Sequence, residues 1–153
     1  MAADSLRYCF VKIMEQLSSS RAEALERWHQ FAASGDTSIL PELLAADCVF
    51  HSPFLWKPKP GKDKAMMALT AASQVFENFA YHRQLTDGTS VVLEFSANVG
   101  AMSLKGIDLI RFNEDGTIAD FEVMIRPAKG LQALAEAMTR QLMKQGNYEA
   151  FIA

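Results

Sequence analysis

Hydrophobic positions in the first forty residues recur every three or four residues, as on one face of a helix. The first such segment spans residues 4–17, with apolar positions at Leu6, Phe10, Ile13, Met14 and Leu17. The string Ser20-Arg21-Ala22-Glu23 matches a capping box, in which a serine and a glutamate satisfy the free backbone amides of a helix start. It predicts a second helix from near Arg21 to Ser34-Gly35, followed by a short helix over residues 39–45.

The middle of the chain alternates between apolar and irregular segments. Residues 48–52 predict a short strand, and the loop 53–61 contains three prolines together with Phe54 and Trp56. Residues 62–76, rich in alanine and methionine, predict a further helix. Beyond residue 79 the period shortens to that of strands. We expect strands over residues 80–86, 90–98, 101–112 and 117–126, joined by Asp-Gly and Gly turns, and a last helix over 129–144.

This order predicts an α+β fold in which a long antiparallel meander curls and helices pack on its concave face. Such a cone leaves an interior cavity, a usual place for a small-molecule site. We divide the chain into an N-terminal helical extension (residues 1–20), one domain (residues 21–145) and a C-terminal tail (residues 146–153).

Composition narrows the classes of function. The chain has 153 residues, half of them hydrophobic and 22% charged, and a formal net charge of −3 without a basic run. These values predict one globular domain and argue against a nucleic-acid partner. We find neither a signal peptide nor an apolar stretch long enough for a membrane span, so we expect a cytoplasmic protein with no membrane partner.

The two cysteines, Cys9 and Cys48, belong to no Cys-X-X-Cys or Cys/His ligand spacing. We interpret them as buried free thiols, and we expect neither a metal nor a cofactor.

One polar residue stands out inside the third strand of the meander. Asp108 lies in an apolar run, and burying a carboxylate there is costly unless the group is paired or protonated. It is either a hydrogen-bonded structural group or the polar centre of a pocket.

Several segments resemble the NTF2-like superfamily, in particular the SnoaL-like domains. They are residues 26–36, 43–53, 106–118 and 121–127, and they include the string Ile107-Asp108-Leu109-Ile110-Arg111-Phe112-Asn113. The resemblance covers roughly residues 21 to 143. It implies the cone fold of a superfamily that includes ketosteroid isomerase, polyketide cyclases, limonene epoxide hydrolase, dehydratases and non-enzymatic binders, so fold alone does not decide function.

The resemblance also assigns positions. Asp108 resembles the isomerase's oxyanion-hole aspartate, a carboxylic acid that its apolar site keeps neutral so that it can donate a hydrogen bond. The isomerase's general base falls at Ser52, which is too weak a base, and its oxyanion-hole tyrosine falls at Trp28, whose indole can still donate. Steroid isomerisation by the family's mechanism is therefore disfavoured.

His51 is the best remaining candidate for a base, because histidine titrates near neutral pH, and a His51–Asp108 pair would form a proton-transfer dyad. The alternative is a structural histidine. Ligand-binding candidates are the aromatic, serine and methionine side chains Trp28, Phe31, Ser52, Phe54, Trp56, Met66 and Met67. Each of the apolar ones is better explained as ordinary core, except that Trp56, in the loop, is better suited to a lid or a subunit contact.

We therefore predict a protein that binds a small apolar or carbonyl-bearing ligand with Asp108 as its anchor. Acid–base chemistry of the isomerase, cyclase or dehydratase type would fit such a site. The alternative is a non-catalytic binding or structural protein whose cavity is filled by side chains. Apolar residues on the outer sheet face, among them Leu109 and Met124, predict a homodimer through that face.

Overall fold

A single curled sheet frames the computed structural model, which describes residues 17–153. The helix expected over residues 4–17 lies outside this range except for its last residue. The sheet has six strands in the order β2-β1-β6-β5-β4-β3. Their bounds are β1 Leu44–His51, β2 Lys59–Pro60, β3 Glu77–Thr86, β4 Ser90–Val99, β5 Met102–Phe112 and β6 Ile118–Arg126.

The predicted antiparallel meander is present in β3 to β6, each strand pairing with the next along the chain. β1 differs from that expectation, because it pairs in parallel with β6 and not with its sequence neighbours of the meander. The sheet is therefore mixed. The two-residue strand β2, inside the predicted loop, pairs antiparallel with β1 and extends that edge.

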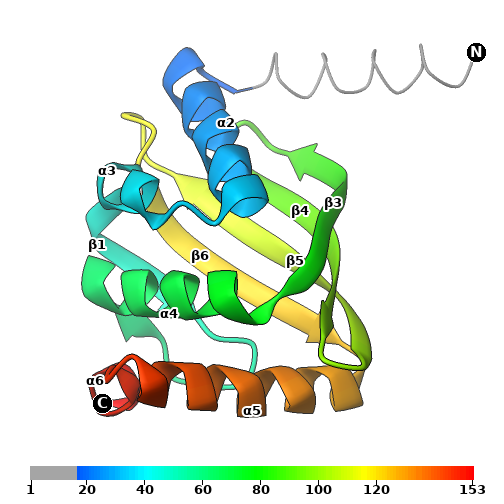
Figure 1. Cartoon of the computed structure of the whole chain (residues 1–153). Coiled ribbons are helices and arrows are strands. Elements are labelled where there is room, and N and C mark those ends of the chain that lie inside the picture. Colours follow the sequence, from blue (N-terminus) through cyan, green and yellow to red (C-terminus); the bar gives the residue numbers. More distant parts are fainter. Residues whose placement is uncertain (1–16) are drawn as a thin grey trace, which may run out of the picture.

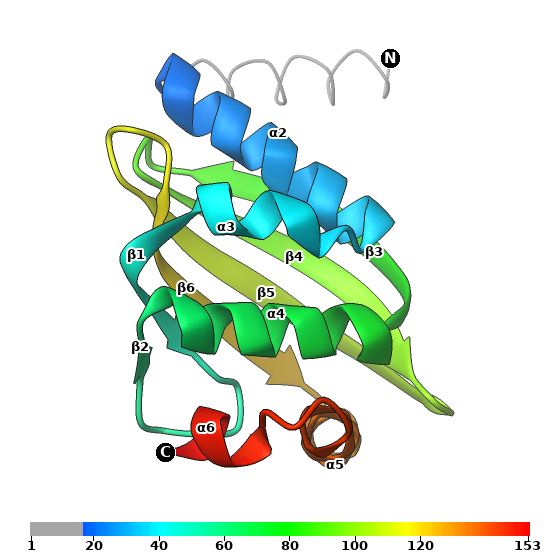
Figure 2. The same cartoon turned by 60° about the vertical axis from the view of Figure 1, so that its left-hand side comes forward.

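Helices cover one face of the sheet, as Figures 1 and 2 show. Their bounds are α2 Ser19–Ser34, η1 Thr37–Ile39, α3 Leu40–Leu43, α4 Lys62–Val75, α5 Ala128–Lys144 and α6 Tyr148–Ile152. The short helix expected over residues 39–45 is thus shorter, since Leu44 already begins β1. Helix α6 lies in the segment assigned to a tail and was not predicted. No helix among residues 17–153 is long and apolar enough to cross a membrane.

Strand alternation sets what faces the helices. On β4 every second side chain is buried, from Val91 to Val99, and the residues between them are half-exposed. On β5 the buried row runs from Leu104 through Gly106, Asp108 and Ile110 to Phe112. Because successive side chains point to opposite faces, Asp108 must point into the concave side with these apolar neighbours.

The capping box expected at Ser20 does not form. Helix α2 begins at Ser19, two residues before the predicted start, and the Ser20 hydroxyl donates instead to the backbone oxygen of Glu114, at 2.7 Å. The β5–β6 turn packs closely against this helix start. A Cβ on Gly116, whose φ is +87°, would lie 2.5 Å from the backbone oxygen of Ser20. The serine therefore fixes a turn to the helix. The predicted end of α2 at Gly35 is confirmed, with φ of +71°.

Candidate functional site

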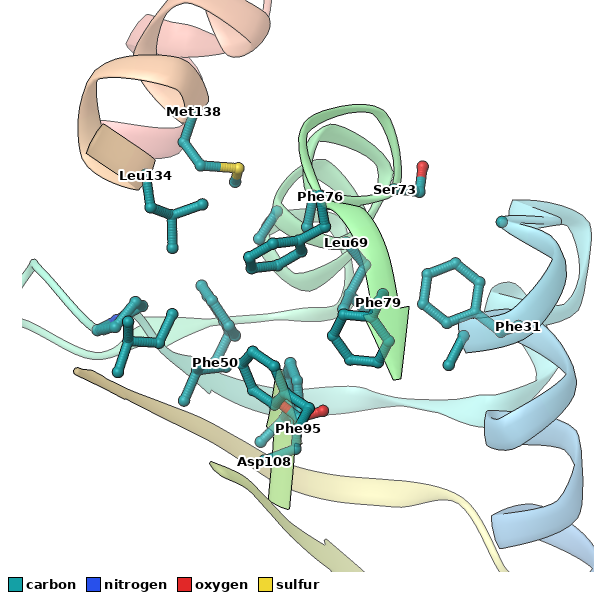
Figure 3. A pocket seen from close by; sticks show the side chains of 18 of the residues that line it. Phe31, Phe50, Leu69, Ser73, Phe76, Phe79, Phe95, Asp108, Leu134 and Met138 are labelled. Carbon is teal, nitrogen blue, oxygen red and sulfur yellow. The ribbon is translucent and has the colours of Figure 1, made fainter. Parts of the chain in front are cut away.

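The concave side of the sheet and the helices enclose a cavity of about 340 Å³. Figure 3 shows it bounded by Phe31 of α2 at one end and by Leu134 and Met138 of α5 at the other, with Phe76 between them and Asp108 on the sheet below. Most of the lining is aromatic or aliphatic. A cavity of this size and character is typical of sites for small apolar molecules.

Asp108 occupies the middle of the sheet, in register with Leu93 of β4 and Val123 of β6. Strands on both sides keep water away, and the residue is only 5% exposed. Burial raises the pKa of its carboxyl from 3.8 to about 7, while a hydrogen bond from Tyr81 partly offsets the rise. Both the acid and the carboxylate are therefore populated near neutral pH, the range in which proton transfer is most effective.

Tyr81 on β3 is the partner of Asp108. Its hydroxyl donates to Oδ2 of Asp108 at 2.5 Å and accepts a hydrogen bond from Nε1 of Trp28 at 2.9 Å. Burial and the neighbouring carboxylate raise the pKa of Tyr81 well above its usual value, so the phenol stays protonated. The three side chains form one directed chain, Trp28 to Tyr81 to Asp108, which we call the polar relay.

Aromatic rings continue from this relay on the side of β3 and β4. Phe79 meets Tyr81 edge-on with ring centroids 4.9 Å apart, and it stacks on Phe95 at the same separation. Phe95 lies over Gly106 of β5, where a Cβ would come within 2.5 Å of the ring. The glycine thus makes room for the ring that forms the cavity wall beside Asp108.

Of the predicted site residues, Trp28, Phe31, Ser52, Phe54 and Asp108 line the cavity. Trp28 and Phe31 come from the buried face of α2, and their ring centroids lie 5.4 Å apart. Ser52 and Phe54 follow the end of β1, and the Ser52 hydroxyl accepts a hydrogen bond from the Phe54 amide.

The predicted His51–Asp108 pair does not form. Because Phe50 of β1 faces the core, the next side chain, His51, points to the outer face of the sheet. There its Nε2 lies 3.1 Å from Oδ2 of Asp120 on β6, and both side chains are about one-third exposed. His51 therefore lies on the opposite face of the sheet from the cavity and cannot act on a ligand there.

Three further candidates lie away from the cavity. Trp56 is fully exposed in the loop before β2. Met66 and Met67 pack partly buried against the core, but the face of α4 that lines the cavity runs through Leu69, Ser73 and the residues beside them. Neither methionine is among the residues that line the cavity, so the prediction that they contact the ligand is wrong for this cavity.

Tyr81 was missed in the sequence. Its signal was the alternation of Phe79 and Tyr81 on β3, which places both side chains on the inner face. The polar residues next to it point outward, where His82 contacts Ser96 and Arg83 pairs with Glu94. Spacing along one strand did not reveal that Tyr81 and Asp108, two strands apart in the sheet, meet at their side-chain tips.

The outer face of the sheet carries an apolar strip flanked by charges. The strip consists of Leu85, Val92, Ile107, Leu109 and Met124, of which Leu85 is 62% and Met124 48% exposed. Glu94 beside it contacts both Arg83 and Lys105. In the described part of the chain no cluster of His, Cys, Asp or Glu is arranged to hold a metal ion.

Comparison with known proteins agrees with this architecture. Residues 25–121 match the family described as SnoaL-like domain. The structure is similar to that of a steroid delta-isomerase from Pseudomonas aeruginosa, with 54% identity, a TM-score of 0.82, and coverage of 84% of this chain and 96% of that one. It is also similar to an uncharacterised conserved bacterial protein with a cystatin-like fold from Silicibacter pomeroyi, with 35% identity, a TM-score of 0.80, and coverage of 87% and 94%.

An LEH-like epoxide hydrolase from M. tuberculosis shares the fold at 16% identity and a TM-score of 0.55, with coverage of 80% of this chain and 94% of that one. Among proteins with curated descriptions, none matches this chain significantly.

Proposed function

The chain belongs to the SnoaL-like domain family, and from this premise we propose that it binds a small, mostly apolar carbonyl compound and catalyses proton transfer next to the carbonyl. The single observation that carries the proposal is the pairing of Asp108 with Tyr81 inside an apolar cavity. Isomerases, cyclases and dehydratases share this elementary step. The similarity to a steroid delta-isomerase from Pseudomonas aeruginosa supports the same class of reaction.

Asp108 and Tyr81 have different roles in the proposed reaction. Proton transfer beside a carbonyl needs one group to move the proton and another to hold the oxygen that becomes negative. Asp108, as carboxylate, takes a proton from the carbon, and the C–H electron pair moves into the enolate. Tyr81 stabilises the enolate oxygen by a hydrogen bond from its hydroxyl and keeps its proton. Return of the proton from Asp108 to the same or another carbon completes the cycle.

The polar relay favours a change in the acceptor of the Tyr81 hydrogen bond, from Asp108 to the substrate oxygen. Before reaction the Tyr81 proton is held by a charged Asp108, and after proton abstraction Asp108 is neutral and attracts it less. The negative charge has moved to the substrate oxygen, so the Tyr81 hydroxyl directs its hydrogen bond to that oxygen. Trp28 donates to the Tyr81 oxygen and thereby stabilises negative charge that develops there.

A substrate-independent assay tests the proposal. We would incubate the protein with a bicyclic ketone, 2-tetralone, in D₂O and follow loss of its α-hydrogens by NMR. The wild type should accelerate the exchange, and Asp108→Asn and Tyr81→Phe should each lower the rate by about 10²-fold or more, the range expected for a positioned acid or base. His51→Gln, which changes the outer face only, is the matched control and should exchange like the wild type.

The second candidate is a binding protein without catalysis, which the weak base Ser52 at the family's base position favours. It predicts binding of the ketone that depends on Asp108 but no accelerated exchange. If the ketone neither binds nor exchanges, the carbonyl proposal is wrong.

A further inference from the structure

Helix α6 closes the cavity at the end away from the polar relay. Figure 2 shows this short helix beside α5, below α4 and next to the loop that follows β1. Its Phe151 is only 2% exposed and lines the cavity together with Leu134 and Met138 of α5. The structure therefore contains a wall supplied by a segment outside residues 25–121, the part that matches the family.

A row of rings separates this wall from the polar relay. The ring centroid of Phe151 lies 6.2 Å from that of Phe50 of β1, Phe50 stacks on Phe121 of β6 at 5.6 Å, and Phe121 lies 5.0 Å from Trp28. Trp28 is the first member of the relay. A molecule whose oxygen lies at Tyr81 and Asp108 would thus extend over Phe121 and Phe50 and meet Phe151 at its far end.

Two lysines hold the wall in place. The Lys59 ammonium donates to the backbone oxygen of Ile152 at 2.9 Å and lies 5.6 Å from the centre of the Phe151 ring. Lys64 of α4 donates to the backbone oxygens of Ala150 and Phe151. These carbonyls belong to the last turn of α6, which has no intrahelical donors for them, and cations at that end are favoured.

Lys59 is 4% exposed, which is unusual for a lysine. Burying an ammonium is costly unless it is paired, and here its partners are the helix carbonyl and the Phe151 ring. The buried lysine is thus directed at the residue that forms the wall. A fixed wall follows from this arrangement.

We infer that Phe151 limits the length of the ligand, and that Lys59 and Lys64 are positioning residues that hold α6 against the cavity. The inference rests on the proposed function, since it assumes a ligand whose oxygen lies at Asp108. It deepens that function by naming the substrate class, which is a compact ketone and not a long-chain one.

The test uses two homologous series measured by titration calorimetry on the full chain. One series is the 2-alkanones from pentanone to undecanone, and the other is the n-alkylbenzenes from toluene to hexylbenzene, which lack a carbonyl. For the wild type, affinity should rise about fourfold with each methylene until the chain reaches Phe151, and then stop rising. In Phe151→Ala the rise should continue for at least one further homologue in both series.

Ile152→Ala, on the 41% exposed side of the same helix, is the control and should keep the wild-type limit. In Lys59→Met the affinity should level off more gradually with chain length, while the affinity for the shortest ketone stays that of the wild type. If Phe151→Ala does not fold by circular dichroism, Phe151→Leu carries the test, with a smaller shift. The inference that Phe151 limits ligand length is wrong if a folded Phe151 variant keeps the wild-type limit, or if the wild type binds neither series.

The alkylbenzenes separate this inference from the proposed function. If they bind with a limit that Phe151→Ala moves, while 2-alkanones bind no better and Asp108→Asn changes nothing, the wall stands and the carbonyl proposal fails. If Asp108→Asn weakens only the ketones and the limit does not move, the carbonyl proposal stands and the wall fails.

Discussion

The hydroxyl of Tyr81 lies 2.5 Å from Oδ2 of Asp108, and it uses its only proton for that contact. The remaining oxygen of Asp108 has no protein donor among the hydrogen bonds of the described residues. It is therefore the atom of the relay that is available to a ligand, as acceptor when Asp108 is ionised and as donor when it is protonated.

Stability should fall as pH rises from about 4 to about 7. Asp108 has a folded-state pKa of about 7, raised above the ordinary 3.8, so in this window the folded state holds a proton that the unfolded state has released. The total effect is on the order of 4 kcal/mol, because each pH unit between the two pKa values contributes about 1.36 kcal/mol. Urea denaturation across this pH range measures it.

Asp108→Asn should flatten that slope and make the protein more stable than the wild type above pH 7, because the amide is neutral and Tyr81 can still donate to it. Asp47→Asn, at an exposed position of β1, is the control and should keep the slope. A wild-type profile without this decline would mean that Asp108 is ionised throughout.

Tyr81→Phe should raise the pKa of Asp108 above about 7, because the Tyr81 hydrogen bond lowers it in the wild type. Carboxyl ¹³C NMR of aspartate-labelled protein reports the shift. The variant also leaves the Trp28 indole without an acceptor, at a cost of about 1–3 kcal/mol. Tyr148→Phe, at a half-buried tyrosine of α6, should move neither quantity, and equal titration in both variants would contradict the relay.

Gly106→Ala should destabilise the fold by about 1–3 kcal/mol, the usual cost of overpacking a core. Its Cβ would lie 2.5 Å from the Phe95 ring and 2.6 Å from the backbone oxygen of Met124. The backbone cannot give way as a flexible side chain does. Lys105→Ala, the exposed neighbour on β5, should stay within about 0.5 kcal/mol of the wild type, and denaturant midpoints decide between the two.

The outer strip should bind a second copy of this chain. We propose a homodimer because the strip is apolar and partly exposed, and because the charges beside it are already paired within the chain. Light scattering should give the mass of a dimer, and Met124→Glu should give the monomer. Met143→Glu, at a 57% exposed position of α5, should remain dimeric; a monomeric wild type refutes the proposal.

Cys48 should resist thiol reagents in the native protein. It is 1% exposed, and burial raises the pKa of its thiol, so little thiolate forms at neutral pH. In a Cys9→Ser background the thiol should react with Ellman's reagent only after addition of denaturant. Immediate reaction of the folded protein would show that β1 opens.

The periodic elements could be read from the sequence, and the side-chain partnerships could not. The change to a strand period identified β4 and β5, and the apolar run around Asp108 suggested either a structural group or the centre of a pocket; the burial pattern of the two strands places Asp108 on the inner face. Strand alternation should have placed His51 outside, because Phe50 beside it is the apolar residue. Tyr81 and Asp108 meet across an intervening strand, and local pattern contains no information on such contacts.

Helix α6 is a second feature that could not be predicted from the sequence. Five residues are too few to show a helical period, and in isolation they would not form a helix. They become helical because Phe151 fills the space beside Phe50 and the two lysines satisfy the terminal carbonyls. Tertiary contact, and not propensity, decides their structure.

The parallel pairing of β1 with β6 has a consequence for the order of folding. β3 to β6 can assemble by successive hairpins, whereas β1 joins only after the chain has returned through α4 and the whole meander. Phe50 and Phe121, which face each other across that last junction, are brought together by it. Phe50 and Phe121 both line the cavity, so a molecule that occupies it contacts both strands of that junction and should stabilise the completed sheet against unfolding.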